Sequence, residues 1–434
     1  MRYKVYAGTV ETFENRNGQW AVFSNRMRFR WTKKVLVYNS CGDSVEGEET
    51  EGVLIEPLVE LENKSAGVFT CRVPYKIETR FGTLKNPYYD SFVMGQTWVM
   101  VEEDSECIFF GKVTEYEREF NLDKSISADG ILKELEKMQT RLEADSYTNL
   151  GLLDRTMRAN KSDKGDSPVN CMEKGNVTVE SRSIDTTETG DQFGSFWSIL
   201  STYVLDKDEG YLRLRLANDP GTANYFFYYD YLKEEDVPKT GQTIEYGVNM
   251  LDFTWNEKLS SDMVNSVTAH GIQTTKKGWW IFAKTTYDVI TATCSDTFSI
   301  NNYGLISRHI YVDGKANTED SLYEAASKEL KNYKQSAEPT LTVKSFDRRD
   351  AGETVEKLGY LLRTHILSEP HDIDRWMVCT KVKLPLDGPN SKEFTFGLTS
   401  KKLSKRVTSI FDAVSSIITG VKGLIGHINE VSTG

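Results

Sequence analysis

"QTWVMVEEDSECIFFGKVTEYEREF", residues 96–120, decides the fold class of this chain. Apolar and polar residues alternate through it in two runs, which meet at the acidic stretch from Glu103 to Glu106. A period of two puts successive side chains on opposite faces of a strand, so the pattern predicts two antiparallel strands joined by a turn. Adjacent acids in such a turn, as at Glu102 and Glu103, are expected to be solvated surface residues.

The same alternation occurs in two separate parts of the chain. The first runs from Lys34 to Arg118 and includes two strands around the turn-rich stretch Asn63–Gly67. The second comprises "TIEYGVNMLDFTWNE" (243–257), "PTLTVKSFD" (339–347), "YLLRTHIL" (360–367), "RWMVCTKVKLPL" (375–386) and "KEFTFGL" (392–398). Short strands at this spacing predict two small, closed or nearly closed antiparallel β units. No internal repeat of about 20 to 50 residues is visible in the sequence.

Segments with mixed character separate these β units. Helices are predicted for "GILKELEKMQTRL" (130–142), "QFGSFWSILSTYVL" (192–205) and "TEDSLYEAASKELKNY" (318–333), because apolar residues recur at helical spacing. A hairpin is predicted at 210–231, where Asp219, Pro220 and Gly221 supply a turn. These parts of the chain are therefore expected to be α+β.

An apolar stripe lies close to the C-terminus in "LSKRVTSIFDAVSSIITGVKGLIGHI", residues 403–428. Its steps alternate between four and three residues, which is the spacing of a coiled-coil seam. β-Branched seam residues and a second apolar row through Phe411, Ile418 and Ile425 favour three or more strands. The predicted oligomer interface is Leu403, Val407, Ile410, Val414, Ile417, Val421, Leu424 and Ile428. Docking of this helix on its own domain is the alternative.

Composition narrows the function classes. The chain has 434 residues, so we expect about two to four domains. Its net charge is −11. Specific nucleic-acid binding is disfavoured because Lys and Arg do not cluster. We recognise neither a signal peptide nor a membrane-spanning stretch. The six cysteines are scattered without a CxxC pair, which indicates neither a zinc site nor a disulfide framework and fits synthesis in a reducing cytoplasm.

One cluster of histidines and acids is a candidate metal site. The stretch "HILSEPHDID" (365–374) holds His365, His371, Asp372 and Asp374, but it lies in a predicted turn and lacks the expected ligand spacing. The sequence contains no HExxH, GxSxG, P-loop or dinucleotide-binding motif. We therefore expect no catalytic residue, no metal and no cofactor, and the chain is not predicted to be an enzyme.

Several segments follow one another in the order found in a known family. They are "LIEPLVELENKSAGVFTCRVP" (54–74), "ECIFFGKVTEYEREFNLDKSISADGILKELEKM" (106–138), "GYLRLRL" (210–216), "TIEYGVNMLDFTW" (243–255), "VNSVTAHG" (264–271) and "HDIDRWMVCTKVKLPLDGPNSKEFTFG" (371–397). As an ordered set, these segments resemble the tail hub proteins of bacteriophages and prophages, which include tail-associated lysins and prophage endopeptidase tail proteins. The resemblance covers residues 34–400, and no single motif carries it.

The resemblance implies a β-rich α+β fold with two small β-barrel-like tube domains, inserted α+β domains and a C-terminal coiled-coil helix. We expect an N-terminal extension at 1–33, the first tube domain at 34–118 and an α+β domain at 119–240. The second tube domain would combine 241–270 with 338–400 around an α+β insertion at 271–337. Residues 401–434 would form the trimerising helix.

The resemblance also implies a function: a homotrimeric structural hub at the tip of a phage or phage-like tail. Such a hub closes the tail tube and joins it to the distal tail or baseplate until infection. The implied partners are a distal tail or tail tube protein, a tape-measure protein and receptor-binding proteins. The implied location is the virion, after synthesis in the host bacterial cytoplasm and without stable membrane insertion before infection.

Many members of this family continue into a lytic or receptor-binding region. None is recognised here, so lytic activity is not expected. The alternatives are a tail-associated cell-wall hydrolase and a host carbohydrate-binding tail protein. For the latter, the aromatic residues around Trp279 and Trp280 would form the platform.

Overall fold

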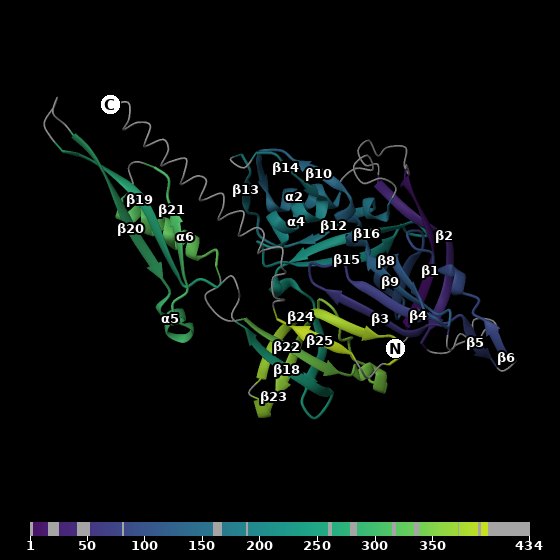
Figure 1. Ribbon diagram of the computed structural model, residues 1–434. Coiled ribbons are helices and arrows are strands. Elements are labelled where there is room, and N and C mark those ends of the chain that lie inside the picture. Colours follow the sequence, from purple (N-terminus) through teal and green to yellow (C-terminus); the bar gives the residue numbers. More distant parts are fainter. Residues whose placement is uncertain are drawn as a thin grey trace. The chain divides into compact units, whose positions relative to one another are not determined.

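A computed structural model describes residues 3–15, 26–40, 53–79, 82–158, 167–187, 190–258, 263–277, 284–314, 318–333, 338–371, 373–388 and 392–397. Contacts divide the chain into two compact units. The larger unit comprises Met1–Thr254 and Leu341–Thr399, and the smaller unit includes Trp255–Thr340. Strands predominate in both units (Figure 1), as the alternating sequence pattern predicted.

One sheet of 16 strands forms the framework of the larger unit. Its strands in chain order are β1 (Tyr3–Asn15), β2 (Arg26–Asn39), β3 (Ile55–Glu62), β4 (Val68–Val73), β7 (Trp98–Glu103), β8 (Glu106–Arg118), β9 (Lys124–Gly130), β12 (Met172–Val177), β15 (Tyr211–Asn218), β16 (Tyr225–Leu232), β17 (Lys239–Glu245), β18 (Met250–Lys258), β22 (Glu338–Ser345), β23 (Arg363–Ser368), β24 (Ile373–Pro385) and β25 (Glu393–Phe396). The two predicted β units are therefore joined edge to edge, because β3 pairs with β24. Among the described residues, the pairings form an open path and close neither β unit into a barrel.

The sheet contains the same strand order twice. One set reads β3-β4-β9-β8-β7, and the other reads β18-β22-β25-β24-β23. In both sets the chain passes through the strands in the same sequence, and the corresponding pairs that are recorded run antiparallel. We call β3, β4, β7, β8 and β9 repeat 1, and we call β18, β22, β23, β24 and β25 repeat 2. A further strand flanks each repeat: β1 lies antiparallel to β7, and β17 lies parallel to β23.

The middle strands of the two repeats match in detail. β8 and β24 each have 13 residues, and each pairs with one neighbour through its first half and with another through its second half. The β8–β9 ladder shifts register between Val113 and Glu115, and the β24–β25 ladder shifts between Cys379 and Lys381. A β-bulge of this kind bends the strand and increases its twist. Both middle strands therefore bend at the same place.

The repeats differ in what joins their first two strands. In repeat 1, the turn from Asn63 to Gly67 joins β3 to β4, and Gly67 has a φ of 75° that favours glycine. In repeat 2, residues 259–337, which belong to the smaller unit, stand in the sequence between β18 and β22. The smaller unit is therefore an insertion at the position of a short turn.

Residues 131–238 form an α+β layer that shares a core with the first β unit. Its helices are α1 (Glu134–Lys137), α2 (Asn149–Met157) and α4 (Phe196–Leu200), with the small strand pairs β10 (Gln139–Leu142) with β14 (Gln192–Ser195) and β11 (Ser146–Thr148) with β13 (Ser183–Asp185). Phe29, Trp98 and Phe110 from the sheet lie in one buried cluster with residues of this layer. Phe29 stacks on Phe227 at 5.5 Å between ring centroids. Burying each such side chain contributes about 1.5–3 kcal/mol.

Two of the predicted helices are shorter than expected. In the stretch 130–142 a 3-10 turn and α1 end at Lys137, because Met138 adopts an extended backbone and β10 follows. In 192–205 the strand β14 comes first, Ser195 then caps α4 by accepting a hydrogen bond from Ser198 N, and a π-helical turn continues the helix from Ser201 to Leu205. The predicted hairpin at 210–231 is confirmed by β15 and β16.

The smaller unit has its own sheet and core. Its strands are β19 (Ser266–Lys277), β20 (Lys284–Ser295) and β21 (Ser307–Tyr311), in the order β20-β19-β21, and its helices are α5 (Thr297–Tyr303) and α6 (Glu319–Leu330). Val267, Ala292 and Leu322 belong to a buried cluster between the sheet and α6. The helix predicted in 318–333 is confirmed, and Thr318 and Ser321 form a capping box at its start. Nowhere in the described part of the chain is a helix both long and apolar enough to span a membrane.

Candidate functional site at the junction of the two repeats

Two strands from the two repeats join them directly. β3 pairs antiparallel with the second half of β24, from Lys381 opposite Glu62 to Pro385 opposite Leu58. On one face, Val59, Val382 and Leu384 are buried. On the other face, Lys383 Nζ lies 3.5 Å from Glu60 Oε1, and Lys381 Nζ lies 4.0 Å from Glu60 Oε2. This strand junction combines backbone hydrogen bonds, an apolar face and opposite charges.

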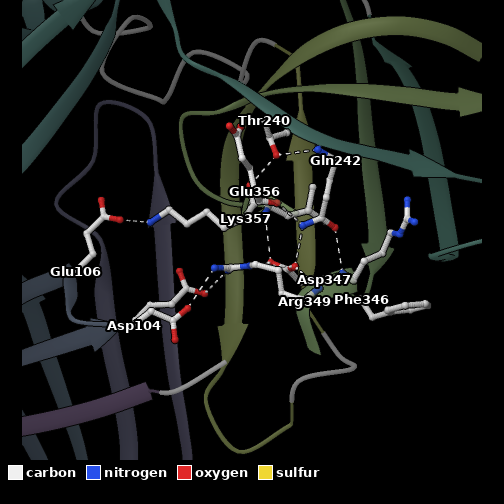
Figure 2. Close-up of polar contacts among 12 residues, drawn as sticks. Asp104, Glu106, Thr240, Gln242, Phe346, Asp347, Arg349, Glu356 and Lys357 are labelled. Atoms are coloured by element: carbon white, nitrogen blue, oxygen red, sulfur yellow. Dashed lines mark hydrogen bonds and ion pairs between the residues drawn. The ribbon is translucent and has the colours of Figure 1, made fainter. Parts of the chain in front are cut away.

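A second contact between the repeats is a polar clasp, drawn in Figure 2. It links the β7–β8 turn, which carries Asp104 and Glu106, to the segment 346–357 that precedes β23. Arg349 donates to Asp104 at 3.1 Å and also lies 3.5 Å from Glu103. Lys357 forms an ion pair with Glu106. Both cations come from one repeat and all three acids come from the other, so the clasp aligns the repeats by charge.

Asp347 holds Arg349 of the clasp in place through a buried carboxylate. Its carboxylate is completely buried and accepts hydrogen bonds from Gln242 Nε2 at 2.8 Å, Arg349 N at 3.0 Å and Leu358 N at 3.2 Å. It also lies 3.1 Å from Arg349 Nη2. Burial opposes ionisation of Asp347, yet hydrogen bonds from Arg349 and Gln242 outweigh it and hold its pKa below the usual value. A buried carboxylate with this many donors fixes the direction of Arg349.

The segment 346–357 also covers an edge of β17. Gly241 N donates to Glu356 Oε2 at 2.9 Å, and Thr240 Oγ1 donates to Lys357 O at 2.8 Å. Gln242 is buried and accepts from Arg348 N at 3.0 Å. These bonds satisfy polar groups that an edge strand would otherwise expose. The clasp is therefore attached firmly to repeat 2.

Glu103 connects the clasp to the N-terminal strand. It is only 5% exposed and accepts from Tyr3 OH at 3.1 Å. Burial raises the pKa of Glu103, and the charges of Lys392, Lys357 and Arg349 together with the Tyr3 hydrogen bond oppose this without cancelling it. Lys392, which immediately precedes β25, is itself buried. Strand β1, the β7–β8 turn, the segment 346–357 and the residue before β25 thus all interact with one carboxylate.

The sequence prediction for the acidic turn is wrong for Glu103. We expected a solvated hairpin tip, but the structure buries Glu103 and pairs Asp104 and Glu106 with cations of repeat 2. The residues that make the difference, Arg349 and Lys357, lie more than two hundred positions away in the sequence. Asp104 and Ser105 have φ values of 49° and 72°, a strained turn that a local pattern of acids does not reveal.

The two histidines of the candidate metal site at 365–374 contact different side chains. His365 Nε2 lies 2.7 Å from Asp374 Oδ1, and its ring stacks on Trp376. His371 instead packs against Phe253, with 4.5 Å between ring centroids. Asp372 lies outside the described residues. Within the described ranges, no three His, Cys, Asp or Glu side chains come together as a possible metal site.

The predicted seam residues, Leu403, Val407, Ile410, Val414, Ile417, Val421, Leu424 and Ile428, lie outside the described residues. Trp279 and Trp280, the predicted carbohydrate platform, also lie outside them. The oligomer interface therefore stays a prediction from sequence, and the junction of the repeats is the candidate site that the structure describes.

Comparisons with known proteins give structural likeness alone. No protein-family model and no curated protein sequence matches the chain. Among solved structures, the chain is similar to prophage tail protein gp18 from Listeria monocytogenes EGD-e, with 12% identity, a TM-score of 0.45, and coverage of 96% of this chain and 99% of that one. It is also similar to the tail protein from Neisseria meningitidis MC58, with 12% identity, a TM-score of 0.49, and coverage of 91% and 96%.

A third similar structure is a chain of the phage P2 baseplate in its activated conformation with Ca, at 8% identity and a TM-score of 0.38, covering 91% of this chain and 98% of that one. These neighbours are tail and baseplate proteins, the class that the sequence resembles. At these identities and TM-scores the likeness carries no conclusion about the individual residues of this chain.

Proposed function

We propose that this chain is a structural protein of a phage or phage-like tail, and that it acts as a trimeric hub at the tail tip. The observation that carries the proposal is the repeated strand order within one chain. Each chain has two matching repeats, so three chains together present six similar β units around one axis. A ring of that kind matches a sixfold tail tube or distal tail ring, although the hub itself has only threefold symmetry.

The junction of the repeats supports this role. A ring subunit needs a fixed angle between its two contact units, because a small error would be multiplied around the ring. The β3–β24 pairing and the charged clasp fix that angle by two independent contacts. In the proposal, each repeat forms one barrel-like wall segment, and the wall closes only when three chains assemble.

The heptad seam would hold the three chains together at 401–434. The hub would close the tube, contact the distal tail or tail tube protein and the tape-measure protein, and reside in the virion. Receptor-binding proteins are further proposed partners. The proposed role is structural and requires no cofactor.

The test is the oligomeric state of the full chain in solution. Light scattering coupled to size exclusion is expected to give a trimer, and a chain ending at Lys402 is expected to associate more weakly. Val414→Asp places a charge in the predicted seam and should weaken the trimer, whereas the matched control Ser415→Asp lies outside the seam and should not. A full-length chain that stays monomeric at micromolar concentration would overturn the proposal.

A further inference from the structure

In the part of the chain that the structure describes, the second half of β8 lacks the strand partner that the second half of β24 has. β7 pairs with β8 only as far as Lys112, and β23 pairs with β24 only as far as Val378. The next backbone bonds also correspond, since Val113 N donates to Thr97 O and Cys379 N donates to Leu362 O, at 2.9 and 3.0 Å. Beyond this point β3 occupies the edge of β24. Among the described residues, no strand takes the corresponding edge of β8.

In repeat 2, the strand that corresponds to β3 is β18, and its outer edge can take a further strand. β3 lies between β4 and β24, whereas β18 ends the strand order of the described residues and lies next to β22. An edge strand of this length is a template for pairing with another chain. Within the described ranges, each repeat thus has one half of the junction without a paired strand: repeat 1 has the acceptor edge on β8, and repeat 2 has the donor strand β18.

Burial along the two middle strands agrees with a missing partner. Counted from the matching bulges, Tyr116 corresponds to Val382 and Phe120 corresponds to Leu386. Val382 and Leu386 are 0% and 1% exposed, whereas Tyr116 and Phe120 are 43% and 106% exposed. The ordered β8–β9 turn holds Phe120 in the open, since Leu122 N donates to Glu119 O and Asn121 bonds Asp123 through both side-chain atoms. Exposed aromatic residues on a rigid frame are typical anchors of protein interfaces.

We propose that β18 of one copy pairs antiparallel with Glu115–Arg118 of β8 in a second copy, and so reproduces between chains the β3–β24 junction found within one chain. This inference rests on the proposed trimeric hub and names the surfaces that close its ring. The contact is head to tail, because β18 and β8 belong to different repeats. Head-to-tail contacts generate a closed ring when the rotation between copies fits, and an open filament when it does not.

The junction within the chain and the proposed junction between copies differ in their charged residues. Lys381 and Lys383 lie beside Glu60 within the chain, but Glu115 and Glu117 stand at the corresponding places on β8. The junction between copies therefore lacks that ion-pair set and depends on backbone pairing and on burial of the two aromatic residues. A weaker junction is consistent with a separate seam at 401–434 that holds the copies together.

Intermolecular disulfides test the pairing in the full chain. Asn249 O accepts from Phe346 N at 3.2 Å, so β18 runs antiparallel to β22, and Asp252 and Thr254 share a face while Leu251 lies on the other. Chains carrying Arg118→Cys are mixed with chains carrying Thr254→Cys or Asp252→Cys and oxidised. We expect a covalent dimer in at least one of these mixtures and in neither protein alone. The matched control is Leu251→Cys, which is exposed on the opposite face and should crosslink at least tenfold less.

Each outcome decides between the pairing and the proposed function. A trimer by light scattering without either crosslink rejects the strand pairing and leaves the hub. Crosslinks in open chains of many copies support the pairing and reject the closed ring. A monomer without crosslinks rejects both. A crosslink as strong at Leu251→Cys as at Thr254→Cys also rejects the pairing.

A second measurement does not depend on disulfides. Tyr116→Asp combined with Phe120→Asp should weaken association of the full chain at least tenfold and leave its unfolding temperature nearly unchanged, because both side chains are exposed in the single chain. Phe193→Asp is the control, since Phe193 is 78% exposed on β14, which pairs with β10. Equal association of the double variant and the control would contradict the proposal.

Discussion

Thr114 and Thr380 lie in corresponding β-bulges of the two repeats. Each is the extra residue between two ladder positions of its middle strand, and each side chain bonds across to the neighbouring strand. Thr114 Oγ1 donates to Asp129 Oδ2 at 2.9 Å, and Thr380 Oγ1 donates to Gly397 O at 2.7 Å. A bulge sets where a long strand bends, so this correspondence gives both repeats the same curvature.

Removing the buried carboxylate should loosen the clasp. Asp347→Ala leaves Arg349 without its main buried partner, removes the acceptor of Leu358 N, and removes one of the two acceptors of Gln242 Nε2, which also donates to Glu356 O. Breaking one side of a buried ion pair costs about 3–5 kcal/mol. We expect a lower unfolding temperature and faster amide exchange in β17. Ser105→Ala, in the β7–β8 turn but not one of the charged residues of the clasp, is the control, and equal exchange in both variants would contradict the role of Asp347.

The clasp should also respond to pH through Asp347. Its pKa lies below the usual value, so its contribution to stability is present above the unfolded-state value of about 3.9 and is lost as the pH falls through the lower folded value. The difference in unfolding temperature between the native chain and Asp347→Asn should stay constant from neutral pH to about pH 5 and shrink in stronger acid. A difference that grows in acid would show that Asp347 is not ionised in the folded chain.

Glu103 should have the opposite dependence. Its pKa is raised by burial, so its contribution to stability is fully present below the unfolded-state value of about 4.3 and is lost as the pH rises through the higher folded value. Glu103→Gln mimics the neutral acid and removes this dependence. The stability of the native chain relative to Glu103→Gln should therefore decrease from about pH 4 towards pH 7. Thermal unfolding of both proteins at several pH values measures it, and a rising difference would refute the assignment.

The sequence predicted the strands but not their partners. Alternation in residues 96–120 predicts β7 and β8 from local spacing alone. The repeat was invisible because corresponding positions share burial and backbone geometry without sharing residue types, as at Phe69 and Leu341, which are both buried on strands next to the repeat's last strand. The clasp was missed for a different reason. Charge pairing across distant segments has no local signal, so the acids from Glu103 to Glu106 resembled ordinary surface.

A buried arginine should hold the α+β layer against the first β unit. Arg28 on β2 is 2% exposed; its Nε donates to Asp219 Oδ1 at 3.0 Å, and its Nη2 lies 2.8 Å from Glu173. Its guanidinium also lies 4.0 Å from the ring centre of Phe226. Lysine cannot replace this planar fork. Arg28→Lys should expose the β15–β16 turn at Asp219 to proteolysis, while Arg30→Lys on the same strand should not, because Arg30 is exposed. Equal cleavage of the two variants would contradict this role.

The smaller unit should be removable without loss of the larger one. It is inserted between β18 and β22, where repeat 1 has only the turn from Asn63 to Gly67. The ends of paired antiparallel strands are close in space, so a short turn can join Lys258 to Glu338. The smaller unit has a separate buried cluster around Val267, Ala292 and Leu322, so deleting residues 259–337 removes no residue of the buried cluster around Phe29, Trp98 and Phe110.

We therefore expect a chain with residues 259–337 replaced by Asn-Lys-Ser-Ala-Gly, the turn sequence of repeat 1, to fold and to retain the clasp. Circular dichroism should show a cooperative transition, and amide exchange in β17 and β23–β25 should match that of the full chain. The control deletes Asn63–Gly67 instead, which breaks a turn with no spare residues and should destabilise repeat 1. If the replacement chain unfolds as readily as this control, then β18 and β22 depend on the inserted unit for their pairing, and the two repeats are not equivalent folding units.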